Sequence, residues 1–196
     1  MNIKKIILLF CVLFLVMQSE AQTDVESFYM KSQKNNNTGM FVLGSWAILN
    51  IASGAWGMSA KSGSTKYFYQ MNLFWNTVNL GIAGVALASG YLTDVSALSH
   101  AEMIDKHLTT EKVLLINAGL DVLYMAGGAF MVSKSKNSTK RPDLLKGYGQ
   151  SLLLQGGFLL VFDGIMYMVQ HQLSSGFLEN VDLSLGLQSF QLAVRF

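Results

Sequence analysis

The sequence predicts an all-α membrane protein: a bundle of four transmembrane helices with a cleavable N-terminal signal peptide and a short extracytoplasmic C-terminal tail. Hydrophobic residues make up 51% of the 196 residues and charged residues only 13%, about half the charged share of a soluble domain. Four apolar stretches are each long enough to cross a bilayer, and basic residues gather in alternate connections between them. This composition excludes a disordered or highly charged chain, and the net charge of +2 gives no reason to expect nucleic acid as a partner.

Residues 1–21 have the three parts of a secretory signal peptide. Lys4 and Lys5 form a basic start, residues 6–17 are apolar, and small residues precede Gln22. The apolar run is shorter than the roughly 20 residues that a spanning helix needs, so cleavage is favoured over an uncleaved anchor. We therefore predict a mature chain that starts at Gln22 with an extracytoplasmic segment, residues 22–38. Cys11, in the apolar run, is the single cysteine of the sequence. A disulfide framework is therefore excluded.

The predicted transmembrane domain covers residues 39–171. Its four spans are residues 39–58, 70–92, 112–132 and 149–170. None of them alternates polar and apolar residues as barrel strands do, and all contain glycines, which are common in membrane helices. Small residues four positions apart, such as Gly84 and Ala88, allow helices to pack closely.

The charges of the connections predict the topology. Lys61 and Lys66 follow the first span, and a lysine cluster with Arg141 follows the third, whereas acidic residues balance the middle connection. By the positive-inside rule both basic connections are cytoplasmic and both termini are periplasmic. The predicted location is the cell inner membrane, with several passes through the lipid bilayer.

Two segments outside the spans have patterns of their own. Residues 96–108 carry apolar residues at helical spacing, which predicts an amphipathic helix lying on the outer leaflet. His100, Met103 and His107 form one stripe of soft ligands on it, of the kind that suits copper, although a surface helix needs no metal to explain it. In the tail, residues 172–196, apolar residues alternate from residue 181 onward, which predicts a short strand or hairpin outside the membrane.

A duplicated helical hairpin is a further hypothesis. Displacing the first span by 71 positions aligns Asn50 with Asp121 and Gly57 with Gly128. Displacing the second span by 80 positions aligns Lys66 with Lys146. The alternative is chance, because membrane segments resemble one another by composition.

Polar residues inside the spans are the candidate functional site. Asparagines recur at helical spacing on one face of the second span, and Asn117 and Asp121 share a face of the third. At about 1.5 Å of rise per residue, Asp121 and Asp163 lie level, about 12 to 13 Å below the outer surface. The predicted polar layer, a candidate ion or proton site, comprises Asn50, Asn76, Asn79, Asn117, Asp121 and Asp163.

Two interpretations of this layer stay open. Two carboxylates in a low dielectric would share a proton or hold a cation, with asparagine carbonyl groups completing the oxygen ligands. Alternatively, the same residues are interhelical hydrogen-bond glue worth about 0.6 kcal/mol per contact on average, and this interpretation is favoured.

The first and second spans also carry a set of aromatic, small and asparagine residues. The set comprises Gly39, Met40, residues 42–47, Asn50, Ile51, residues 70–72, Trp75, Asn76 and Asn79. It resembles an uncharacterised, domain-of-unknown-function family of small four-helix bacterial integral membrane proteins. The resemblance implies a membrane protein with a polar face and supplies no activity.

The predicted function is that of a non-enzymatic scaffold or accessory subunit, bound to a membrane-protein partner or to further copies of itself. No set of nucleophile, base and orienting residue is visible, so no enzyme is predicted. The spans contain no histidine to hold a haem, and no cofactor or metal is predicted. The alternative is a small proton- or cation-coupled carrier or channel that uses Asp121 and Asp163.

Overall fold

The computed structural model describes the backbone of residues 3–189 and the side chains of residues 25–177. Almost all of the described chain is helical. Its elements are α1 (Ile3–Ala60), α2 (Gly63–Leu92), the short 3-10 helix η1 (Val95–Ala97), α3 (His100–Ser135) and α4 (Pro142–Ser189). The predicted all-α class with four helices is therefore confirmed.

Each long helix contains a stretch that is long and apolar enough to cross a membrane. These stretches are Val25–Ala60, Gly63–Leu92, His100–Ser135 and Pro142–Phe177. Their 30 to 36 residues extend about 45 to 54 Å at the α-helical rise, beyond a hydrocarbon core of about 30 Å. Large apolar side chains cover the outside of the bundle, as at Val85, Leu123 and Phe130, which are 72%, 65% and 67% exposed. Such a surface fits lipid rather than water.

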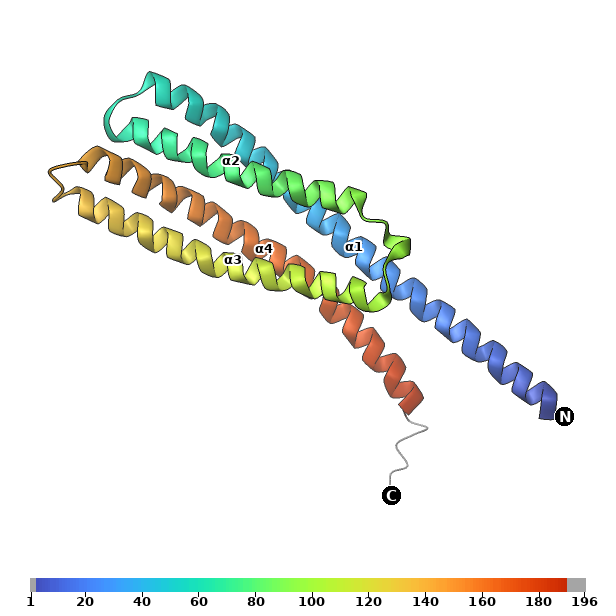
Figure 1. Ribbon diagram of the computed structural model, residues 1–196. Coiled ribbons are helices and arrows are strands. Elements are labelled where there is room, and N and C mark those ends of the chain that lie inside the picture. The colour runs from blue at the N-terminus through green and yellow to red at the C-terminus, as the bar shows by residue number, and fades with distance from the viewer. Residues whose placement is uncertain (1–2, 190–196) are drawn as a thin grey trace.

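Two helical hairpins lie side by side (Figure 1). α1 packs on α2, α3 packs on α4, and α2 packs on α4 between the hairpins, whereas α1 passes behind α2 and also reaches α3 and α4. We call the end with the α1–α2 and α3–α4 connections the basic end, because it holds Lys61, Lys66 and the cluster of residues 134–146. The end with the connection of residues 93–99 is the far end.

The helix boundaries follow from local sequence. Gly63 begins α2 with a φ of +58°, a conformation that costs glycine little. Ser99 and Glu102 form a reciprocal capping box that begins α3, since each side chain accepts the other's backbone N–H. Pro142 begins α4, at a position where a missing N–H costs nothing.

The structure corrects the prediction of a separate surface helix over residues 96–108. The capping box at Ser99 starts α3 directly, and the helix continues through the third span. Met103 and His107 are consequently buried in the bundle, 3% and 1% exposed, while His100 faces outward.

The predicted strand in the C-terminal tail is also wrong as far as Ser189, because α4 continues to that residue. A lone strand leaves its backbone N–H and C=O groups without partners, whereas a helix satisfies them internally. Residues 190–196 lie outside the described residues. At the other end, α1 runs without a break from Ile3 through residues 22–38, and the signal peptide stays a prediction.

In each hairpin a glycine lies at a contact between the two helices, and the two glycines occupy corresponding places. Gly57 of α1 lies against Tyr69 of α2, and Gly128 of α3 lies against Gly149 of α4. A Cβ on Gly128 would come 2.7 Å from the Gly149 carbonyl oxygen, so the backbones meet there. Gly128 lies 71 positions after Gly57, and Gly149 lies 80 positions after Tyr69. These are the two offsets on which the duplication hypothesis rests.

Candidate functional site

The polar side chains of the predicted layer and their partners form two groups rather than one continuous layer. The first, the amide network, connects α1, α2 and α4; it comprises Trp46, Asn50, Asn72, Asn76, Asn79, Ser151 and Gln155. The second, the carboxyl pair, consists of Asp121 on α3 and Asp163 on α4. The predicted layer is thus divided between them, and Asn117 lines a cavity beside the carboxyl pair.

Gln155 is the centre of the amide network. Its Oε1 accepts the indole N–H of Trp46 at 2.9 Å. Its Nε2 donates to the Oδ1 atoms of Asn50 at 3.2 Å and Asn72 at 3.0 Å. Ser151 donates to the same Asn72 oxygen at 2.5 Å, and both Ser151 and Gln155 are fully buried.

The asparagine side chains of the network form hydrogen bonds with one another and with backbone carbonyl groups. Asn76 Nδ2 donates to the Asn72 carbonyl at 2.8 Å, and Asn79 Nδ2 to Asn76 Oδ1 at 3.5 Å. Asn50 Nδ2 donates to the Trp46 carbonyl at 2.9 Å. For Asn50 and Asn76, these bonds favour the hydrogen-bond glue interpretation over ion ligation.

The carboxyl pair has a different character. Asp121 and Asp163 are 3% and 6% exposed, and their carboxyl groups lie within hydrogen-bonding reach of each other. Neither forms an ion pair in the described part of the chain, and Oδ2 of Asp121 has no hydrogen-bond partner among the described residues. Among the described residues, two buried acids therefore face one another without a neutralising cationic side chain.

Helix geometry explains why the two acids meet. Side chains of an α-helix tilt toward its N-terminus. Because α3 and α4 are antiparallel, Asp121 tilts toward the far end and Asp163 toward the basic end, so they lean toward each other. Gly156 lets the two helices approach beside the pair, since a Cβ there would lie 3.1 Å from the Asp121 carbonyl oxygen.

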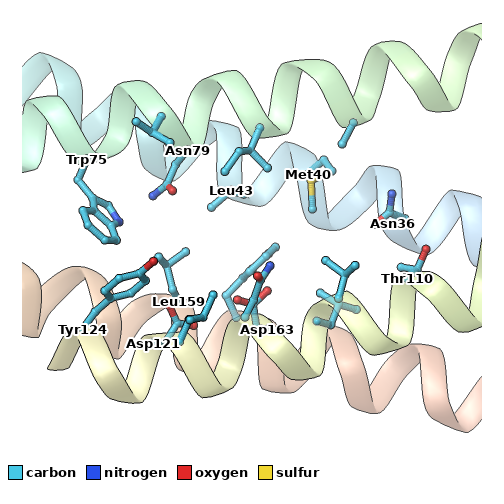
Figure 2. Close-up of a pocket in the computed structure, with 18 of the residues that line it drawn as sticks. Asn36, Met40, Leu43, Trp75, Asn79, Thr110, Asp121, Tyr124, Leu159 and Asp163 are labelled. Atoms are coloured by element: carbon cyan, nitrogen blue, oxygen red, sulfur yellow. The ribbon is translucent and has the colours of Figure 1, made fainter. Parts of the chain in front are cut away.

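The carboxyl pair lines a cavity of about 520 Å³ between α2 and α3. Figure 2 shows α2 and α3 on opposite sides of this cavity, with α1 and α4 behind it. Trp75 and Tyr124 stand at its basic-end side, their rings 4.8 Å apart and edge to face. The Nε1–H group of Trp75 is buried and has no hydrogen-bond partner among the described residues.

A second cavity of about 360 Å³ adjoins the first toward the far end. The two share the lining residues Asn36, Ala86, Thr109 and Thr110. The second cavity is more polar, and its lining includes Ser32, Asp105, Lys106 and His107. The two cavities therefore follow one another from the carboxyl pair toward the far end.

Beside this second cavity lies a hydrogen-bonded cluster of residues from three helices, the far-end cluster. Ser32 Oγ lies 2.7 Å from His107 Nδ1, and His107 Nε2 lies 3.1 Å from Glu111 Oε1. Ser174 donates to the same Glu111 oxygen at 2.5 Å, and His171 Nδ1 lies 3.5 Å from Glu111 Oε2. Ser32 and Glu111 thus bond to the two ring nitrogens of His107, and the tautomer of the ring sets which partner donates.

Ser32, His107 and Glu111 have the order of nucleophile, base and orienting acid, a set that is not visible in the sequence. Ser32 lies inside the continuous helix α1 and is only 4% exposed. Backbone N–H groups around it donate to helix carbonyl groups, so the described structure offers no backbone pair there to hold an oxyanion. We interpret the cluster as a clasp that fastens α1 to α3 and α4.

Sequence reasoning missed the far-end cluster because its members are distant along the chain. Ser32 and His107 are 75 positions apart, and no periodicity relates residues on different helices. Glu111 and His107 at i, i+4 on one helix were the only local signal.

Together, the apolar helices and the buried polar groups define a small four-helix protein whose surface suits a membrane. Residues 42–164 match the family of unknown function DUF6992, and the chain belongs to this family because the match covers more than half of it. The expected membership of an uncharacterised family is thereby confirmed. The amide network and the carboxyl pair lie within the matched residues, whereas Ser32 precedes them. Neither a curated protein nor a solved structure matches the chain.

Proposed function

We propose that this protein is a small proton-coupled carrier of cations whose binding site is the carboxyl pair. The observation that carries the proposal is the placement of Asp121 beside Asp163 in the wall of one cavity, with neither acid in an ion pair among the described residues. Structural polar groups in membranes are normally satisfied by protein partners, as those of the amide network are.

The chemistry of two adjacent acids supplies the coupling. In a low dielectric two neighbouring carboxylates do not both hold their charge cheaply, so the pair retains a proton or gains a cation. A cation that enters the cavity replaces the proton, and a returning proton displaces the cation. Oδ2 of Asp121, which has no hydrogen-bond partner among the described residues, would be a ligand for either.

The proposal includes the predicted placement in the cell. Residues 1–21 are removed, the mature chain starts at Gln22, and the protein resides in the inner membrane with both termini in the periplasm. The basic end then faces the cytoplasm. The lysines of the α1–α2 and α3–α4 connections support this orientation.

The second candidate function is the non-enzymatic scaffold or accessory subunit. The satisfied amide network and the far-end cluster favour it, because both hold helices together without offering free groups. In that case the carboxyl pair is protonated and forms an interhelical hydrogen bond. The binding partner of the protein is then another membrane protein or a second copy of the chain.

Liposome flux separates the two functions. The full mature chain is reconstituted with an internal pH-sensitive dye, and sodium, potassium or organic ammonium gradients are imposed. We expect proton flux that falls at least tenfold in Asp121→Asn and Asp163→Asn, which preserve side-chain size. Asp143→Asn, an exposed acid at the basic end, is the matched control and should retain flux. Proton flux absent from the parent protein under every gradient would refute the carrier and favour the scaffold.

A further inference from the structure

We infer that the cation taken by the carboxyl pair is a lipophilic organic cation, such as an aryl- or alkyl-substituted ammonium, that enters from the bilayer between α2 and α3. The inference rests on the proposed function and names its substrate class. Three properties of the cavity support it: its ligands, its walls and its opening.

The ligands around the carboxyl pair suit an organic cation better than a metal ion. Divalent calcium and magnesium ions require about six oxygen ligands in close coordination. Within the described residues no three acidic, histidine or cysteine side chains are placed to hold a metal. Asn50 and Asn76 are engaged in the amide network and do not line the cavity, whereas the amides of Asn36, Asn79 and Asn117 do. Amides are neutral, so the carboxyl pair supplies the only acidic ligands among the described lining residues. One ionised carboxyl group of the pair neutralises a bulky monovalent cation, which has no tight hydration shell to be replaced.

The walls of the cavity are mostly apolar and aromatic. Trp75, Tyr124 and Phe162 line it together with aliphatic residues and the carboxyl pair. Aromatic rings attract organic cations through their negative faces, most strongly where water is excluded. The volume of about 520 Å³ lies in the range of small-molecule sites. An apolar cation would therefore gain both contact area and charge neutralisation.

The opening of the cavity faces the surface that lipid would cover. α2 and α3 are not packed along each other in the described structure, so side chains rather than a helix contact close this side. Val78 and Ile82 of α2 and Val113 and Leu120 of α3 line the cavity and are also 63%, 55%, 48% and 39% exposed. Apolar residues on both lips admit a molecule dissolved in the acyl chains, whereas, in the described part of the chain, a hydrated ion would find a polar lining only on the side of the second cavity, toward the far end.

Proton competition follows from the groups that line the cavity. On α3 these include Asp121 and the phenol of Tyr124, and on α4 Asp163 is the titratable one. α1 and α2 contribute amides, an indole and apolar side chains to the described lining. Raising the pH removes the proton of the pair, so the affinity for the cation should rise with pH.

Binding of tetraphenylphosphonium to the purified full chain in detergent tests the inference. We expect saturable binding that releases protons and weakens at least tenfold in Asp163→Asn. Val78→Trp, which fills the lip of the cavity, should weaken binding similarly without touching the acids. Val85→Trp, on the same helix and outside the cavity lining, is the matched control and should bind normally.

The outcomes distinguish failure of this inference from failure of the proposed carrier function. Failure of the parent protein to bind tetraphenylphosphonium, together with sodium- or potassium-driven proton flux in liposomes, would overturn the organic substrate and retain the carrier. Absence of both binding and flux would overturn both. Binding unchanged in Asp163→Asn and in Val78→Trp would place the probe elsewhere and likewise overturn the inference.

Discussion

Replacing Gln155 by leucine tests whether the amide network holds the two hairpins together. The substitution removes the bond from Trp46 and the bonds to Asn50 and Asn72. At about 0.6 kcal/mol for each interhelical bond in a membrane, the loss is roughly 2 kcal/mol. The indole N–H of Trp46 is then left without this partner, which adds about 1 kcal/mol. We therefore expect the free energy of unfolding to fall by roughly 2 to 3 kcal/mol.

Reversible unfolding in mixed detergent micelles, followed by circular dichroism, measures this free energy. Gln150→Leu is the matched control, because Gln150 is exposed on the same helix and should tolerate leucine within about 0.5 kcal/mol. A double-mutant cycle with Trp46→Phe isolates one bond, since phenylalanine retains a ring to stack on Phe158. The reasoning fails if Gln155→Leu is no more destabilising than Gln150→Leu.

Three further predictions concern packing, the far-end cluster and topology. Gly128→Ala should lower the free energy of unfolding by about 1 to 3 kcal/mol, because the added Cβ meets the α4 backbone. Gly127→Ala should be neutral, because a Cβ there meets open space. The same unfolding assay compares the two variants, and equal effects would contradict the close approach of α3 and α4. His107→Leu should lower the free energy of unfolding by about 1 to 3 kcal/mol, because it leaves Ser32 and Glu111 without this hydrogen-bond partner. His100→Leu changes an exposed position and should have little effect. Similar unfolding curves for both variants would argue against the clasp. A reporter active only in the cytoplasm should stay silent when fused after Phe196, and activity there would reverse the topology.

The placement of the acids shows how far sequence reasoning reaches. Asp121 and Asp163 were expected at the same depth because the helical rise is constant and the two spans run in opposite directions. The structure brings them together. Asn50 and Asn76 were expected in the same layer, yet their amides bond within the amide network. Depth along a helix is predictable from counting, but rotation and lateral neighbours are not.

The sequence by itself determined the number of helices, their apolar surfaces and the basic end, because length, composition and charge act locally along the chain. Only the tertiary structure decided that α2 and α3 stand apart around a cavity, that Ser32 meets His107, and that α4 continues to Ser189. The physical reason is that lipid is as apolar as leucine, so hydrophobicity does not select which helices become neighbours. Close contacts of small residues and complementary hydrogen bonds make that selection, and both depend on side chains far apart in the chain.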